Sequence, residues 1–152
     1  MSLCNTSENN IMLLLFNNTN WANVGDATGL RGSTTAGSFY VSGHTADPGE
    51  AGSQTTSETT YTGYARAAVA RSGAGWTVSG TAPTQAANAA TVSLGACTSG
   101  SGTLTYFIVG RDNAGAGEAM FIGAVTSPGS GLAVSAGITP QFAAGALVVT
   151  VY

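Results

Sequence analysis

The chain has 152 residues, of which 43% are hydrophobic and only 7% are charged, and its net charge at pH 7 is −3. This length suits one domain with its own core, and the hydrophobic content excludes intrinsic disorder, which needs low hydrophobicity and high net charge. The basic residues are four arginines that form no cluster, so nucleic-acid binding is not expected.

The N-terminal segment predicts one short helix. Thr6 or Ser7 can cap it, and Glu8 then lies in the first turn, where the helix dipole favours a carboxylate. Gly25 and Gly29 are expected to end the helix, followed by a loop to residue 37. Its apolar side chains, which we expect to pack on the rest of the domain or on a neighbouring copy, are Ile11, Leu14, Leu15 and Phe16.

From residue 39 onward, alternating apolar and polar residues indicate β-strands. Residues 44–57 are expected to form a loop, because Asp47-Pro48-Gly49 is turn chemistry. Gly63 suggests a bulge or bend within a long strand, and residues 72–75 turn the chain. The predicted strands are 39–42, 59–71, 76–78, 91–96, 104–108, 119–125 and 147–151.

Many short strands separated by turn signals predict a mainly β fold. We expect a single antiparallel β-sandwich, jelly-roll-like, with one short N-terminal helix. Residues 1–37 would be the helix and loop that pack on the domain or on a neighbour, and residues 38–152 would be the sandwich domain.

No pattern in the sequence indicates catalysis or cofactor binding. His44 is the only histidine, is expected in a loop, and has no GxSxG nucleophile elbow to serve. Asp47 and Glu50 offer carboxylates for calcium, but they lack the DxDxDG pattern, so a simple turn is the preferred interpretation. The glycine-rich stretches at 100–102 and 112–117 lack a GK[ST] ending and are interpreted as hairpin loops. We therefore expect no enzyme activity, no cofactor and no metal.

The two cysteines and the one apolar run of the sequence indicate neither a metal site nor a membrane segment. Cys4 and Cys97 lie in no CxxC motif and beside no histidine, so zinc is not expected. Free thiols suit a protein assembled in a cytosol, although a disulfide between them stays open. The apolar run 11–16 is too short to span a bilayer and has no signal-peptide flanks, so no membrane partner is expected.

The composition favours association with other proteins. A surface of hydroxyl and amide groups gives little electrostatic repulsion between copies, and it resembles the charge-depleted core of an interface. The alternative is an exported protein with a neutral surface. Tyr64, Arg66 and Arg71 are candidate interface residues, because tyrosine and arginine are enriched at interface hot spots. They could equally belong to a strand that faces water.

The block from Tyr40 to Trp76, YVSGHTADPGEAGSQTTSETTYTGYARAAVARSGAGW, resembles a family of small bacteriophage virion structural proteins. Its members are labelled head decoration (cement) proteins or tail-fibre proteins. The segment 137–147 fits the family's ending, whereas Gly43 and Ala67 replace a large apolar residue and a valine. The resemblance implies a virion component without catalytic residues, and decoration proteins of this size tend to be β-sandwich trimers.

Three functional hypotheses follow. The first is a capsid decoration or cement protein, a homotrimer assembled in the host cytoplasm, that binds the major capsid protein outside the assembled head at subunit joints and stabilises it. The alternative is a tail-fibre or other tail-associated module that recognises a host-surface glycan, with the loop HTADPGEAG (44–52) as its candidate site. The third, a glycan hydrolase, needs a paired acid and nucleophile, and the seven carboxylates are scattered.

Overall fold

The computed structural model describes residues 3–81, 83–126 and 131–151. The chain forms two compact units. The first unit consists of Met1–Ser38, Val69–Thr91 and Ala143–Tyr152, and the second of Phe39–Ala68 and Val92–Phe142. The predicted N-terminal segment 1–37 therefore shares its unit with two later parts of the chain.

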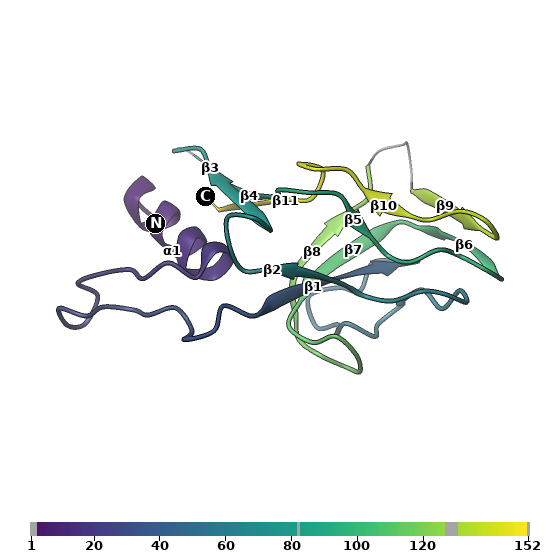
Figure 1. Cartoon of the computed structure of the whole chain (residues 1–152), viewed down its shortest axis with the longest axis horizontal. Helices are drawn as coiled ribbons and strands as arrows, with labels where there is room; N and C mark the ends of the chain where they lie inside the picture. Colours follow the sequence, from purple (N-terminus) through teal and green to yellow (C-terminus); the bar gives the residue numbers. More distant parts are fainter. Residues whose placement is uncertain (1–2, 82, 127–130, 152) are drawn as a thin grey trace. The chain divides into compact units, whose positions relative to one another are not determined.

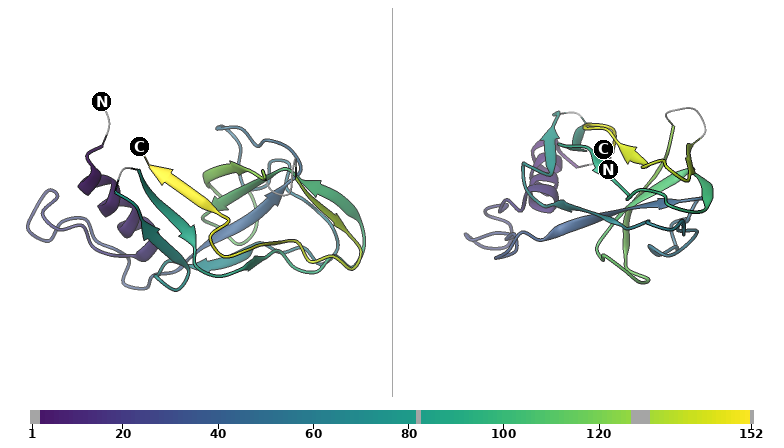
Figure 2. Two further views of the ribbon diagram at one scale, coloured as in Figure 1. Left: turned by 90° about the horizontal axis from the view of Figure 1, so that it is seen from above. Right: turned by 45° about the vertical axis from the view of Figure 1, so that its right-hand side comes forward.

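The first unit combines the helix with a three-stranded sheet. Helix α1 (Asn5–Asn17) packs against β3 (Trp76–Ser79) and β4 (Thr84–Asn88). The antiparallel order is β11-β4-β3, with β11 (Val148–Val151) at one edge, and Figures 1 and 2 show the helix beside these strands. The ring centroids of Phe16 and Trp76 lie 4.9 Å apart in an edge-to-face arrangement. The buried apolar side chains of this unit are Met12, Phe16, Val69, Trp76, Ala86, Leu147 and Val149.

The predicted ends of the helix were wrong. Thr6 and Ser7 lie inside the first turn, and Cys4 is the N-cap residue, with no side-chain capping bond. The helix ends at Asn17 because Asn18 adopts a left-handed conformation (φ 55°) and donates its backbone N–H to the Leu13 carbonyl. The Asn18 side chain then accepts a hydrogen bond from Ser33 N (2.7 Å) and donates one to Ser33 O (2.8 Å), which ties the following loop to the helix end.

The second unit is built on the strands of a four-stranded sheet and two strand pairs. The sheet order is β2-β1-β7-β8, with β1 (Ser38–His44) and β7 (Tyr106–Gly110) in the centre and β2 (Ala67–Ala70) and β8 (Ala119–Ala124) at the edges. The pairs are β5 (Val92–Ser93) with β10 (Gln141–Phe142), and β6 (Ser101–Leu104) with β9 (Leu132–Ser135).

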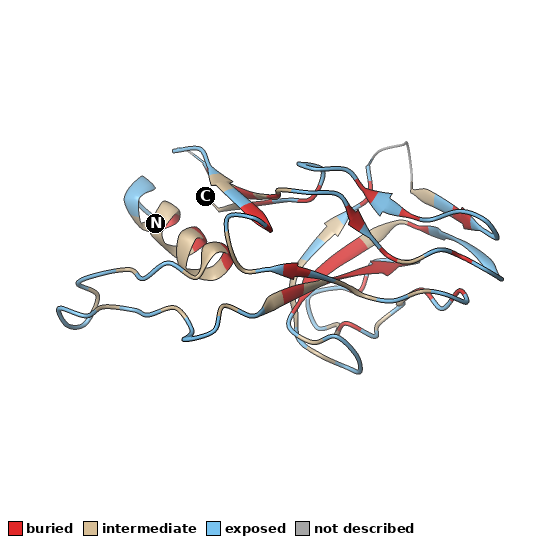
Figure 3. Cartoon of the chain, in the orientation of Figure 1, coloured by how far each residue is buried: buried red, intermediate tan, exposed pale blue. Residues whose placement is uncertain are grey.

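The core of the second unit lies against the central strands, which are buried along much of their length (Figure 3). Phe107 of β7 meets Phe142 of β10 with ring centroids 5.7 Å apart, so the sheet and the β5–β10 pair enclose a shared core. The predicted fold class is confirmed: the described part of the chain is mainly β, with several antiparallel sheets and one N-terminal helix, as expected of a β-sandwich.

Three predicted strands differ from the structure, and of residues 91–96 only Val92–Ser93 form a strand. Of residues 59–71, only Ala67–Ala70 form a strand, because the chain turns at Gly63, where φ is +97°. The predicted strand 104–108 is two strands, since β6 pairs with β9 whereas β7 pairs with β1 and β8. The chain changes partners at Thr105, which separates them. The strands that were not predicted are β4, β9 and β10.

The space beside Gly43 is filled by two leucines from other segments. A Cβ atom at Gly43 would lie 2.9 Å from Leu104 Cδ1 and 3.0 Å from Leu94 Cδ1. Both leucines are fully buried. They occupy the space that the large apolar side chain usual in the family would need. The core therefore stays packed although position 43 is a glycine.

Replacing Gly63 by alanine should destabilise the protein by about 1–3 kcal/mol, because residues other than glycine are strained at positive φ. The added Cβ would also come within 2.1 Å of the Ala96 carbonyl oxygen, so the backbone has to shift. Gly73→Ala is the matched control, since nothing lies within 4 Å of its Cβ position. Urea unfolding measures both, and equal stability of the two variants would contradict the expected strain.

Candidate functional site

A nearly buried ion pair joins Glu58 to Arg66, which precedes strand β2. Arg66 Nε donates to Glu58 Oε1 and Arg66 Nη2 donates to Glu58 Oε2, each at 2.7 Å. The Arg66 side chain is only 3% exposed, and the Glu58 side chain is 14% exposed. This two-pronged geometry is the strong form of an arginine–carboxylate pair, and it fixes the orientation of both groups.

Tyr64 completes the environment of the carboxylate. Its hydroxyl donates to Glu58 Oε1 at 2.6 Å and accepts a hydrogen bond from the Gly43 amide at 3.3 Å. Burial alone would raise the pKa of Glu58, but the hydrogen bonds from Arg66 and Tyr64 outweigh it and lower that pKa. Burial and the neighbouring carboxylate raise the pKa of Tyr64. At neutral pH the site therefore holds a carboxylate, a guanidinium and a neutral phenol.

The same arginine holds the loop between β7 and β8. Its Nη1 donates to the Asp112 carbonyl at 3.0 Å and its Nη2 to the Gly115 carbonyl at 2.8 Å. Gln54, which is fully buried, donates to the Asp112 carbonyl at 3.1 Å and accepts from the Asp112 amide at 2.9 Å. Two buried polar side chains thus fix the position of this loop.

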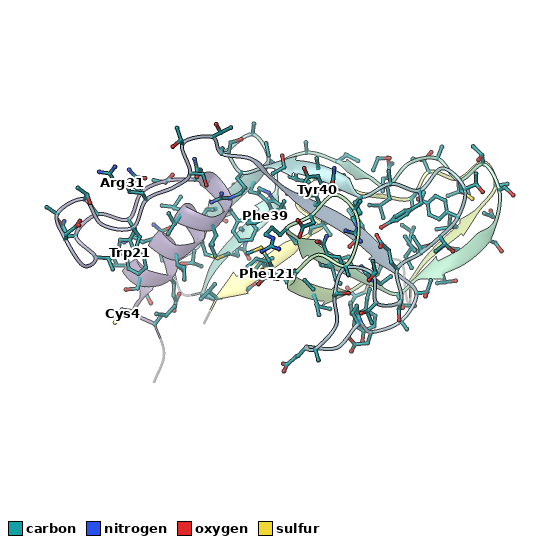
Figure 4. The ribbon with its side chains drawn as sticks, turned by 90° about the horizontal axis from the view of Figure 1, so that it is seen from below. Cys4, Trp21, Arg31, Phe39, Tyr40 and Phe121 are labelled. Carbon is teal, nitrogen blue, oxygen red and sulfur yellow. The ribbon has the colours of Figure 1, made fainter. Side chains whose placement is uncertain are left out.

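Glu58, Tyr64 and Arg66 line a groove of about 570 Å³ that lies wholly within the second unit. The loop between β7 and β8 contributes to its lining, as does Tyr40 on strand β1, which Figure 4 labels. The residues that line this groove are Tyr40, Glu58, Tyr64, Ala65, Arg66, Asn113, Ala114 and Gly115.

Two of the three predicted interface residues in the family-like block, Tyr64 and Arg66, meet at this groove, whereas Arg71 lies in the first unit. Arg71 Nε donates to the Leu15 carbonyl at 2.6 Å and Nη2 to the Leu14 carbonyl at 2.9 Å. These carbonyls belong to the last turn of α1, where a positive charge also complements the helix dipole. Arg71 therefore caps the C-terminus of α1.

The predicted interface residues of the helix occupy different environments. Phe16 is fully buried against Trp76, so it belongs to the core of the first unit. Ile11, Leu14 and Leu15 are half-buried. Contact of these three side chains with another copy stays a prediction.

Sequence reasoning missed Glu58 as the partner of Arg66, and it missed Tyr40, Gln54 and residues 113–115 as parts of one site. One signal was present: in a chain with so few charges, two opposite charges eight positions apart are candidates for a mutual pair. The loop carbonyls gave no such signal, because Asp112 is 46 positions from Arg66 in the sequence.

His44 does not lie in a loop, as predicted, but is the fully buried last residue of β1. One ring nitrogen, Nδ1, is 2.8 Å from the Thr56 carbonyl, and the other, Nε2, is 2.8 Å from Ser42 Oγ. A carbonyl can only accept, so Nδ1 carries the proton and Ser42 donates to Nε2. Burial lowers the pKa of His44, and the neutral ring bridges strand β1 to the segment around Thr56.

Lowering the pH from 7 to 5 should reduce stability by roughly 1 kcal/mol through His44. The unfolded chain takes up a proton near pH 6.5, whereas the folded protein, in which burial lowers the pKa of His44, takes it up only at a lower pH. Stability is therefore lost as the pH falls through the unfolded pKa. The Glu58 contribution is lost only below about pH 4.5, so the two windows are separate. Urea unfolding of His44→Gln should show a flatter profile above pH 5, and an unchanged slope would refute the assignment.

The loop HTADPGEAG forms the expected turn. Asp47 Oδ1 accepts a hydrogen bond from the Gly49 amide at 2.9 Å, and the Gly52 amide donates to the Gly49 carbonyl at 2.9 Å. In residues 3–81, 83–126 and 131–151, no three His, Cys, Asp or Glu side chains gather as a metal site would need.

Both cysteine thiols are free. Cys4 is exposed and Cys97 is buried. As for membrane spans, the described part of the chain contains no helix that is long and apolar enough to cross a bilayer.

Comparison with known proteins identifies the family of this chain. A family model described as podophage GP4 fiber I protein gp80 matches residues 2–150. No curated protein and no solved structure matches the chain significantly.

Proposed function

We propose a structural, non-enzymatic role in a phage fibre for this chain, which belongs to the family of the podophage GP4 fiber I protein gp80. The family is one of phage virion structural proteins, so the chain is a component of the virion. The observation that carries the fibre assignment is the family match, which extends over residues 2–150 and so over nearly the whole of this sequence.

The mechanism of this role is association through a neutral surface. Only 7% of the residues are charged, so copies brought together by the fibre repel each other little. Arg66 at the groove and Arg71 at the end of α1 each form hydrogen bonds within their own unit. We expect the contacts between copies to come mainly from hydroxyl, amide and apolar groups, including the half-buried side chains of Ile11, Leu14 and Leu15.

We expect the purified chain to be a homotrimer. The low charge and the half-buried apolar side chains of α1 favour self-association over a monomer. Light scattering at micromolar concentration and low salt should give three times the mass of one chain, which is 15.0 kDa. A monomer under these conditions would refute self-association.

A second candidate is capsid decoration, with the major capsid protein as partner. The same charge-poor surface suits burial across the joints of a shell, where binding would stabilise the assembled lattice by linkage. The two candidates differ in stoichiometry. Quantitative mass spectrometry of purified particles should find far fewer copies of this chain than of the major capsid protein if it belongs to a fibre. Copies approaching those of the capsid protein would favour decoration instead.

A further inference from the structure

We propose that the groove over the Glu58–Arg66 pair binds a neutral sugar, and this inference rests on the proposed role in a fibre. The site differs from the loop HTADPGEAG that the sequence suggested for such a role. In that loop, Asp47 Oδ1 already accepts a hydrogen bond from the Gly49 amide within its own turn. None of the loop's residues lines the groove.

The groove is preformed rather than shaped by a ligand. Arg66 reaches the Asp112 and Gly115 carbonyls, and Gln54 holds Asp112 through two further hydrogen bonds. Arg66 is 3% exposed and Gln54 is fully buried, so neither side chain has room to rearrange. A rigid site loses little conformational entropy on binding. This favours ligands that bind through polar contacts that are individually weak.

The charge of the groove favours a neutral ligand. The carboxylate of Glu58 and the guanidinium of Arg66 neutralise each other at 2.7 Å. The other lining residues are tyrosine, asparagine, alanine and glycine, which carry no charge at neutral pH. A phosphate, a carboxylate or an ammonium group would therefore be desolvated without a net opposite charge to meet it.

The hydrogen-bonding groups left over in the groove are of both kinds. The backbone amides of residues 113–115 and the side chain of Asn113 have no hydrogen-bond partner among the described residues. Glu58 Oε2 accepts one hydrogen bond, from Arg66, and a carboxylate oxygen has a second lone pair that can accept another. Donors and acceptors close together suit the hydroxyl groups of a sugar, because each hydroxyl can do both.

Tyrosine supplies the apolar part of the site. Tyr40 and Tyr64 line the groove and are both half-buried, so parts of their rings stay accessible. The apolar C–H face of a sugar ring can lie against such a ring while its hydroxyls reach the loop. The volume of about 570 Å³ falls within the range of roughly 300–1,000 Å³ that is typical of small-molecule sites.

The test is nuclear magnetic resonance titration of the isotopically labelled full chain. The neutral probes are maltose, cellobiose, lactose, rhamnose and N,N′-diacetylchitobiose; the competing probes are sialyllactose, digalacturonic acid and a proline-rich peptide. We expect saturable shifts of the amides of residues 113–115 with at least one neutral sugar. Tyr40→Ala and Asn113→Ala should each weaken this binding at least tenfold.

Tyr106→Ala is the matched control, because Tyr106 is a half-buried tyrosine of the same unit outside the groove, and it should leave the affinity unchanged. Asn113 is exposed, so its variant reports on the groove even if Tyr40→Ala fails to fold. Shifts with only the acidic sugars or the peptide, or no shifts with any neutral sugar, would overturn the proposal. The fibre role is judged separately by stoichiometry, so it survives a negative titration.

Discussion

Replacing Arg66 by alanine should lower the free energy of unfolding by about 3–5 kcal/mol, the cost of removing one partner from a buried ion pair. The Glu58 side chain is 14% exposed and would keep its charge or take up a proton without its strongest hydrogen bonds. The Asp112 and Gly115 carbonyls would lose their donors at the same time. Urea unfolding followed by circular dichroism measures the loss.

Arg111→Ala is the matched control for this prediction. Arg111 also pairs with carboxylates, Asp112 and Glu118, but its side chain is 64% exposed. Exposed pairs contribute about 0–1 kcal/mol, so this variant should remain close to the unsubstituted protein. If Arg66→Ala were no more destabilising than Arg111→Ala, the Glu58–Arg66 pair would not be the structural support of the groove.

Replacing Phe16 by alanine should cost about 3–5 kcal/mol, because it empties a fully buried aromatic position in the first unit. The ring meets Trp76 edge-to-face at 4.9 Å, and such aromatic pairs add to the energy of burial. The near-ultraviolet circular dichroism of the folded variant should also change, since Trp76 loses its aromatic neighbour.

The control for Phe16 is Leu30→Ala, because Leu30 is a large apolar residue that is 44% exposed. Its replacement should change stability by less than about 0.5 kcal/mol. Thermal unfolding compares the melting temperatures of the Phe16→Ala and Leu30→Ala variants, and so separates the contribution of the buried ring from that of the exposed side chain. A Phe16→Ala protein that melts at the temperature of the Leu30→Ala protein would show that α1 adds little to the first unit.

The sequence predicted elements where side-chain alternation is strong. Strand β11 lies within the predicted strand 147–151, in which Leu147, Val149 and Val151 alternate along the chain. Val149 is buried, whereas Val148 is exposed. Strand β4 was missed because its sequence, TQAAN, has almost none of the β-branched and aromatic residues that mark strands. Its strand conformation depends on pairing with both β3 and β11, which no local pattern reveals.

The site was less predictable than the fold because its contacts are distant in the sequence. Tyr64 and Arg66 were recognised by residue type, but Arg66 bonds to Glu58 and to carbonyls 46 and 49 positions away. His44 was assigned to a loop because proline and glycine follow it closely. Its partners, Ser42 and Thr56, place it at the buried end of β1 instead.

The groove and the helix cap also alter the expected role of the arginines. Arg66 and Arg71 were both candidates for contacts with other copies. Each makes several hydrogen bonds within its own unit. An effect of Arg66→Ala on particle assembly should therefore be accompanied by a lower melting temperature of the free protein. Loss of assembly at an unchanged melting temperature would instead assign Arg66 to an interface.

Gold-labelled antibodies against the chain, imaged on intact phage particles by electron microscopy, test the proposed fibre role most directly. We expect the label on the fibres, with the surface of the head unlabelled. Labelling spread over the head, with the fibres unlabelled, would contradict the fibre role and assign the chain to the capsid.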